Sequence, residues 1–134
     1  MRLSKAEYEA LASIRYALRQ FLRFSEDAAT AAGLAPRQHQ ALLAIKGFPG
    51  RDRITIGELA ERLQIHHHSA VGLADRLVLH RLAARERGAA DRRQVYLALT
   101  PRGEAVLEKL SAAHKEQLRR IAPQMEKLLK RLAG

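Results

Sequence analysis

The chain has 134 residues, a formal net charge of +10 and no cysteine. Its length fits one ordinary domain, and a hydrophobic content of 47% supports a packed core rather than a disordered chain. The lack of cysteine excludes disulfides, thiolate metal sites and cysteine nucleophiles. No apolar run approaches the ~20 residues of a membrane helix, and residues 1–10 lack the apolar stretch of a secretory signal. We therefore expect a cytoplasmic protein with no membrane association and with an anionic partner.

Arginine carries the positive charge in the middle of the chain. No Lys occurs from Gly47 to Glu108, and arginines are densest between Arg76 and Arg93. The planar guanidinium fork suits phosphates and guanine edges, whereas a lysine acts as a point charge. On charge alone, the sequence is equally compatible with a nucleic-acid partner and with a solvated arginine-rich surface.

Hydrophobic periodicity predicts two helices in the first third of the chain. A long amphipathic helix runs from Ser4 to about Ala31, with Ser4 and Glu7 spaced as a capping box. Gly33 is a natural stop, and Pro36 suits the first turn of a second helix. The residues expected to face inward from this second helix are Leu42, Leu43 and Ile45.

Shorter elements are predicted between residues 47 and 100. They are, in order, a loop at 47–50, a β-prone run at 54–56, helices at 58–63 and 65–80, and strands at 82–87 and 94–99. The two strands flank a turn-forming segment and make a hairpin. Val95, Leu97 and Leu99 alternate with other residues at the period of a half-buried strand.

The last third of the chain predicts one long helix. Thr100 and Pro101 suit its start, and Glu104 is placed to complete a capping box. Apolar residues recur at steps of three and four, close to a coiled-coil repeat. Pro123 is expected to break or kink this helix near Arg120.

This order of elements is that of a winged helix-turn-helix: a mainly α (α+β) fold with a two-stranded β wing. In that motif the second helix enters the major groove of DNA by its N-terminal residues. Here those residues are His66, His67, His68, Ser69 and Ala70. An arginine at the tip of the wing can reach the minor groove. The long terminal helices each have an apolar face that suits the other helix and a second copy of the chain.

Several motifs in this arrangement resemble the MarR family of bacterial transcription regulators. They are the segment 57–63, the segment 69–77, the run Asp91-Arg92-Arg93 leading into Leu99-Thr100, and the set Leu34, Pro36, Gln38 and Leu42. The resemblance covers nearly the whole chain. It implies one MarR-like domain over residues 1–134, with a winged helix-turn-helix lobe at 34–100 and a helical dimerisation lobe at 1–33 and 101–134. One departure is Arg81, which stands where the family usually has glycine.

The resemblance also implies a function. It points to a homodimer that regulates transcription, most often as a repressor, by binding double-stranded DNA at a pseudo-palindromic operator. Two recognition helices would enter successive major grooves about 10 bp apart. A small-molecule effector that rotates one lobe against the other would release the operator. No cofactor, metal or catalytic residue is implied, and the protein is not expected to be an enzyme.

Candidate DNA-binding residues are His66, His67, His68, Ser69, Arg76, Arg85, Arg87, Asp91, Arg92 and Arg93. Each has a plainer alternative. Arg93 can either reach the minor groove or only form a salt bridge with Asp91, and Ser69 can cap its helix instead of contacting DNA. Arg76 can pair with Asp75 or Glu61, and the remaining arginines can be solvated.

The three consecutive histidines can contact DNA or serve as polar residues at a helix entrance. They cannot converge on one metal ion from a regular helix, because consecutive residues point about 100° apart. If they contact DNA, binding should tighten at mildly acid pH. Equal affinity at acid and alkaline pH would reject that idea.

A ligand pocket is expected where the two lobes meet, as the resemblance implies. Its candidate residues are Arg15, Tyr16, His39, Phe48 and His114. The plainer interpretation of the two histidines is that they are satisfied interior residues.

Two other function classes share some of these features: a sequence-nonspecific architectural or RNA-binding module, and a metal-dependent enzyme. The enzyme is disfavoured because no carboxylate lies beside the histidine run.

Overall fold

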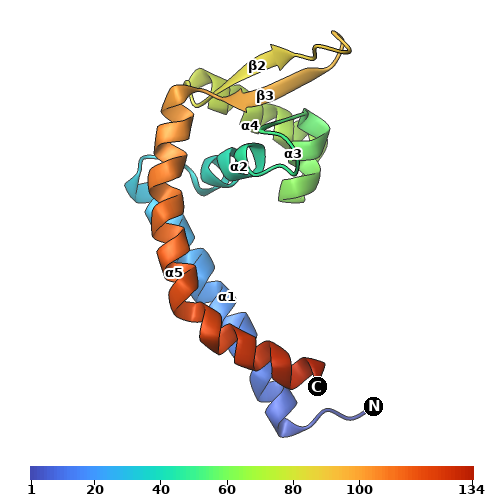
Figure 1. Ribbon diagram of the computed structural model, residues 1–134, viewed down its shortest axis with the longest axis vertical. Helices are drawn as coiled ribbons and strands as arrows, with labels where there is room; N and C mark the ends of the chain where they lie inside the picture. The colour runs from blue at the N-terminus through green and yellow to red at the C-terminus, as the bar shows by residue number, and fades with distance from the viewer.

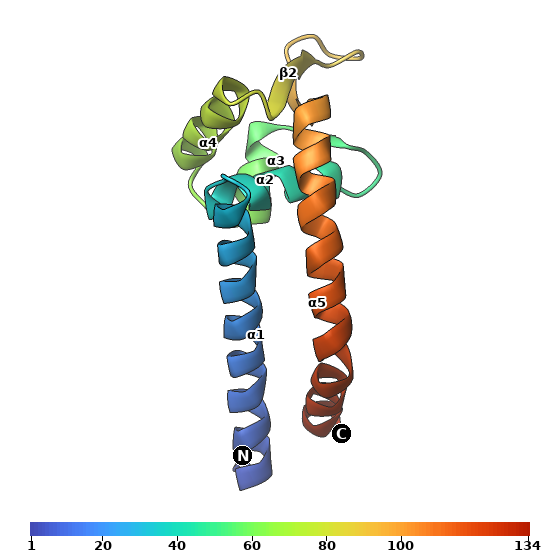
Figure 2. The same cartoon turned by 90° about the vertical axis from the view of Figure 1, so that its left-hand side faces the viewer.

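Two long helices and a smaller lobe at one of their ends make up the computed structural model, which describes residues 1–134 (Figures 1 and 2). The elements are α1 (Lys5–Ala31), α2 (Pro36–Lys46), β1 (Arg53–Ile54), α3 (Ile56–Leu63), α4 (His67–Leu79), β2 (Ala83–Arg87), β3 (Val95–Leu99) and α5 (Pro101–Ala133). Helices α1 and α5 form the long pair, and residues between them form the smaller lobe. The predicted mainly helical winged fold is confirmed. No helix has the length and apolar character needed to cross a membrane.

Side-chain caps define the starts of three helices. The predicted capping box of α1 is confirmed: the Ser4 hydroxyl accepts the Glu7 N–H at 3.1 Å, and the Glu7 carboxylate accepts the Ser4 N–H at 2.9 Å. Thr55 and Glu58 form a second box, so α3 begins two residues earlier than predicted. Thr100 caps α5 through the N–H of Gly103 at 3.1 Å.

One prediction about a helix start is wrong, and one alternative is excluded. Glu104 completes no capping box, because Gly103 occupies the third helical position; its carboxylate instead accepts a hydrogen bond from Lys46 Nζ at 3.0 Å. Ser69 does not cap α4, because the N-cap is His66, whose side chain makes no cap hydrogen bond. Ser69 is therefore the third residue inside the helix.

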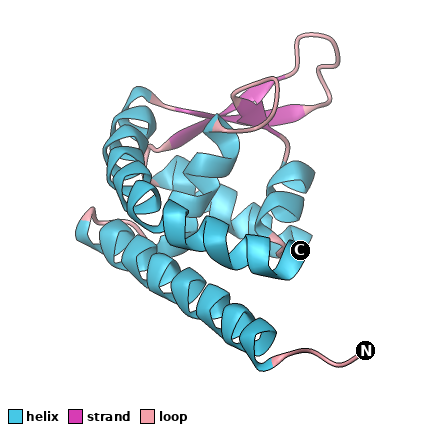
Figure 3. Ribbon diagram, turned by 60° about the horizontal axis from the view of Figure 1, so that its bottom comes forward, coloured by secondary structure: helices cyan, strands magenta, loops and turns pink.

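The sheet has three antiparallel strands in the order β1-β3-β2, one more than the predicted hairpin. Ile54 of β1 pairs with Leu97 of β3, and Arg87 of β2 pairs with Val95 near the free end of the wing. Leu97 is the buried residue of β3, and Val95 is exposed. The loop between β2 and β3 projects beyond the helices (Figure 3).

The core lies in the smaller lobe. Its largest fully buried side chains come from α2, α3, α4 and the sheet: Leu42, Ile45, Ile54, Leu59, Leu73, Leu77, Leu82 and Leu97. The prediction that Leu43 faces inward is wrong, since its side chain is half exposed and lines a surface cavity. Burial of each large apolar side chain contributes about 1.5–3 kcal/mol, so this cluster fixes how α4 and the sheet sit together.

Pro123 does not end α5, which continues to Ala133. The axis of the helix changes direction in its second half, as Figure 1 shows. A proline inside a helix removes one backbone hydrogen bond and crowds the preceding turn, so a bend is the usual consequence. The predicted kink is thus present as a bend without a break.

The joint between α4, the wing and α5 is tightly constrained. Arg81 has a φ of 60°, the left-handed conformation that glycine adopts without cost. The Thr100 hydroxyl donates to the Arg81 carbonyl at 2.6 Å, and the Thr100 N–H donates to the Leu82 carbonyl at 3.1 Å. Arg81 therefore accepts the strain that glycine would avoid, and Thr100 holds the strained peptide in place.

Candidate nucleic-acid interface and junction cavity

The N-terminus of α4 presents three exposed imidazoles. His66 is the N-cap residue, and His67 and His68 occupy the first turn. The rings of His66 and His68 stack with centroids 5.7 Å apart and planes at 5°. Because no side chain caps this helix, its first N–H groups are available to hydrogen-bond an anionic partner.

The rest of α4 has one buried and one exposed face. Ala70, Leu73, Ala74 and Leu77 are buried against the lobe. The exposed residues are Val71, Asp75, Arg76 and Leu79. Val71 is an apolar residue on this exposed face, with an exposure of 39%. Arg76 makes no ion pair, so neither of its predicted partners, Asp75 and Glu61, holds it.

A carboxylate shapes the turn at the tip of the wing. Asp91 Oδ1 accepts the backbone N–H of Arg93 at 3.0 Å and the side-chain Nε of Arg93 at 3.3 Å. The Arg93 side chain nevertheless remains 93% exposed. The turn-shaping contact and the exposed arm, which the sequence left as alternatives, are therefore present together. A Cβ on Gly88 would lie 2.7 Å from the Asp91 carbonyl oxygen, so this turn requires glycine.

Two other arginines of the wing are held by partners. Arg85 forms an ion pair with Asp75, which connects β2 to α4. Arg87 donates to the Arg92 carbonyl at 2.9 Å across the wing loop. Arg92 itself makes no ion pair. The exposed contact between Arg85 and Asp75 links the wing to the helix, an arrangement that helix and strand patterns could not reveal.

A stack of arginines and aromatic rings lies between β1, α3 and β3. Arg51 lies over the Phe48 ring at 4.4 Å, and Arg62 lies 5.0 Å from the same ring. Arg53 lies 4.2 Å from the centre of the Tyr96 ring. Arg51 also pairs with Glu58. Phe48, a predicted pocket residue, thus contacts cations of the winged lobe, and no spacing of residues along the chain indicates this stack.

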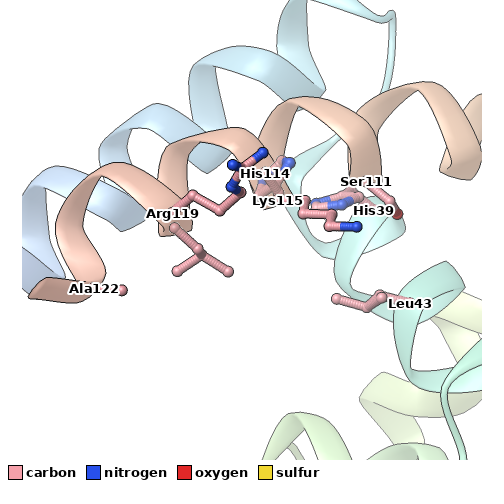
Figure 4. A pocket seen from close by; sticks show the side chains of 8 residues that line it. His39, Leu43, Ser111, His114, Lys115, Arg119 and Ala122 are labelled. Atoms are coloured by element: carbon pink, nitrogen blue, oxygen red, sulfur yellow. The ribbon is translucent and has the colours of Figure 1, made fainter.

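A cavity of about 430 Å³ opens between α2 and α5 (Figure 4). Its lining residues are His39, Leu43, Ser111, His114, Lys115, Leu118, Arg119 and Ala122. Of the five predicted pocket residues, the structure places His39 and His114 in this lining. Arg15, Tyr16 and Phe48 lie outside it; Arg15 and Tyr16 point away from the core and are exposed.

The two cavity histidines are in contact but differ in their hydrogen bonds. Their ring centroids are 4.7 Å apart. His114 Nδ1 lies 2.6 Å from the Leu110 carbonyl and must donate to it, and His114 Nε2 lies 2.8 Å from the Ser25 hydroxyl. The Nδ1 of His39, in contrast, is buried with no hydrogen-bond partner. The plainer prediction of satisfied interior histidines therefore holds for His114 alone.

Burial lowers the pKa of His39 below its ordinary value of 6.5, and the neighbouring His114 lowers it further. His39 comes from α2, the first helix of the smaller lobe, whereas His114 comes from α5 and Ser25 from α1. The chain of contacts from Ser25 through His114 to His39 therefore crosses from the long helices into the smaller lobe.

The long helices leave an apolar groove open to solvent. Its lining residues from α1 and α5 are Ile14, Leu18, Phe21, Leu118, Ile121, Ala122, Met125, Glu126 and Leu129. Leu18, Leu118 and Leu129 are each about half exposed. Contiguous exposed apolar surface of this kind marks an interaction site more often than a solvated surface.

These elements together define a winged helix-turn-helix, a fold that places an α-helix in the major groove of DNA. The model of the MarR family matches residues 32–94, which include α2 to β2 of the winged lobe, so this lobe is similar to a family whose members are transcription regulators. The resemblance predicted from the sequence is confirmed. No curated protein matches the chain.

Solved structures share the fold over the whole chain. A MarR family protein from Bacillus stearothermophilus has a TM-score of 0.80 at 20% identity, covering 99% of this chain and 96% of its own. AbsC, a MarR family regulator from Streptomyces coelicolor, has a TM-score of 0.73 at 22% identity, with coverage of 99% and 95%. A MepR variant from S. aureus, bound to an oligodeoxyribonucleotide, has a TM-score of 0.67 at 18% identity, with coverage of 98% and 97%.

Proposed function

We propose that this protein is a homodimeric, sequence-specific DNA-binding transcription regulator that acts as a repressor and is released by a small-molecule effector. The observation that carries the proposal is the placement of the uncapped, histidine-bearing end of α4 and the exposed Arg93 on one winged lobe. The first would read base edges in the major groove, and the second would enter the minor groove. The MepR structure with DNA supports this arrangement by analogy of fold.

The DNA-contacting residues proposed from the sequence do not all have the same proposed role. His67, His68 and Arg93 are exposed and point to direct contacts, and Arg76 and Arg92 are available for phosphates. Arg85, Arg87 and Asp91 act first by holding the wing in shape. Phosphate contacts give affinity without sequence information, whereas base contacts specify the site.

The apolar groove between α1 and α5 supports the homodimer. Regulators of this family act as dimers, and two copies would bury the half-exposed leucines of both grooves. Leu129→Glu should shift sedimentation from dimer to monomer, whereas Leu79→Glu, on exposed α4, should leave association unchanged. A dimer that persists in Leu129→Glu would place the interface elsewhere.

The effector role rests on the cavity between α2 and α5. A ligand seated there would contact both lobes, so it would favour one relative orientation of the lobes over another. Three of the cavity's lining residues supply apolar surface, and the other five supply polar or charged groups that would orient a ligand.

Selection of bound sequences from a random DNA pool tests the proposal directly. The expected result is a pseudo-palindrome whose half-sites are separated by about 10 bp. Enrichment of no sequence would overturn the proposal in favour of a nonspecific nucleic-acid-binding module. Arg93→Ala should weaken binding to the selected site, and Arg2→Ala, which removes an exposed arginine at the far end of the chain, should not.

A further inference from the structure

We propose that His39 and His114 form a proton-sensitive contact that holds the winged lobe against the long helices when His39 is neutral and loosens it when His39 takes up a proton from solvent. The contact itself follows from the geometry of the junction. Its consequence for DNA binding rests on the proposed function. The proposed regulation depends only on residues of this chain.

The geometry of the pair makes one of the two histidines sensitive to protonation. His114 is satisfied in either charge state: neutral, its Nε2 accepts from Ser25, and protonated, its Nε2–H can donate to the same hydroxyl. His39 has no such partner for its buried Nδ1. A proton on His39 would therefore create a buried cation whose N–H groups are not all satisfied.

The charged groups that face His39 would repel a positive charge on its ring. The titratable and charged side chains that share its cavity are His114, Lys115 and Arg119, all from α5. α2 adds Leu43 to the lining, and α1 contributes Ser25 and the rings of Phe21 and Phe24 against His114. No carboxylate lines the cavity, so a protonated His39 would have cations as neighbours and no counter-ion.

Opening the junction removes this penalty. In an open arrangement water reaches the imidazole of His39, and its pKa rises toward the ordinary value of 6.5. Since the closed form binds the proton more weakly than the open form, the closed form is favoured above about pH 6.5. It loses stability as the pH falls from there toward the lowered pKa of His39. Acid therefore shifts the lobes toward the open arrangement.

The distance between the lobes can be measured on the protein alone, without DNA. Because the chain has no cysteine, each introduced cysteine is a unique labelling site. Spin labels on Asp52→Cys in the winged lobe and Gln124→Cys on α5 report the distance between the lobes within one chain. Diluting labelled with unlabelled protein removes signals between protomers. Between pH 6.5 and the lowered pKa of His39, the ratio of open to closed populations should grow by up to about tenfold for each unit of pH.

Two variants make the measurement specific. His39→Gln removes the titrating group and should abolish the pH-dependent change in distance. His67→Gln removes an exposed histidine far from the junction and should retain the change. A distance distribution that does not respond to pH in the wild-type protein, or that responds equally in His39→Gln, would overturn the proposal.

A second measurement uses only the wild-type protein, so it does not depend on whether the His39→Gln variant folds. Ring NMR titration of the wild-type protein should give His39 a pKa below 6.5. A value at or above 6.5 would overturn the proposal. Neither readout requires DNA, so both remain decisive if random-pool selection returns no operator. Conversely, an operator found with an unresponsive junction would uphold the proposed function and refute the proton-sensitive contact.

Discussion

Substitution of Gly103 by alanine tests the joint through which α5 meets the wing. A Cβ at this position would lie 2.0 Å from the Leu82 carbonyl oxygen and 3.0 Å from its carbon. Because carbon and carbonyl oxygen normally stay about 3.3 Å apart, the two backbones must separate by roughly 1 Å. The same carbonyl accepts the Thr100 N–H at 3.1 Å, so that hydrogen bond would be broken or weakened.

The expected cost combines these two effects. Overpacking a tight contact costs about 1–3 kcal/mol, and a lost hydrogen bond costs about 1 kcal/mol. Alanine recovers up to about 1 kcal/mol through its better helix propensity. Gly103→Ala should therefore lower the free energy of unfolding by about 1–3 kcal/mol.

Urea unfolding followed by circular dichroism, at one protein concentration, measures this loss. Gly57→Ala is the matched control. Gly57 lies inside α3, and its Cβ would meet only the Thr55 hydroxyl oxygen at 4.0 Å, so that variant should be neutral or slightly stabilised. A Gly103→Ala protein within about 0.5 kcal/mol of wild type would show that the joint yields easily, and would refute the reasoning.

Three further predictions concern single residues. Arg81→Gly should raise the free energy of unfolding by about 1 kcal/mol in the same urea assay, because glycine adopts the observed positive φ without strain; a loss of stability would mean that its side chain matters more than its backbone. Arg93→Ala should weaken operator binding by about 1–3 kcal/mol in gel-shift titrations with no change in unfolding, and unchanged affinity would remove it from the interface. Burial would raise the pKa of Glu58, but hydrogen bonds from Thr55 and Arg51 lower it overall. Its stabilising effect is present above pH 4.5 and is lost as the pH falls through the lowered pKa, so Glu58→Gln should flatten the acid limb of a stability profile, and an identical limb would contradict this.

Local sequence signals predicted most of the helices. The Ser4 and Glu7 pair, Pro36 and Thr100 all act within one turn of their own helix, so spacing alone identifies them. Thr55 shows why the start of α3 was misplaced. It lies between Ile54 and Ile56, and three β-branched residues favour a strand, yet the side chain of Thr55 caps a helix. The strand that does form, β1, has two residues and is too short to show a period.

The site was predictable only as far as its contacts are local. The hydrogen bonds that Asp91 accepts from Arg93 span only two residues, so the sequence could predict this turn of the wing. The ion pair between Arg85 and Asp75 depends on how β2 packs against α4, which no periodic pattern encodes. The same holds for Gln38, whose side chain lies 2.9 Å from His80 Nδ1 at the end of α4.

If both the proposed DNA contacts and the proposed His39 contact exist, the two groups of histidines would give DNA binding opposite dependences on pH. Protonation of His67 or His68 near phosphates would strengthen binding and steepen its salt dependence, since each added phosphate contact raises the slope by about 1. Protonation of His39 would weaken binding by loosening the lobes, without adding a phosphate contact. A flat pH profile of operator affinity is therefore no test of either group. The salt dependence of binding would respond to the exposed histidines, and the distance between the lobes would respond to His39. Measuring both therefore separates two effects that would cancel in the affinity alone.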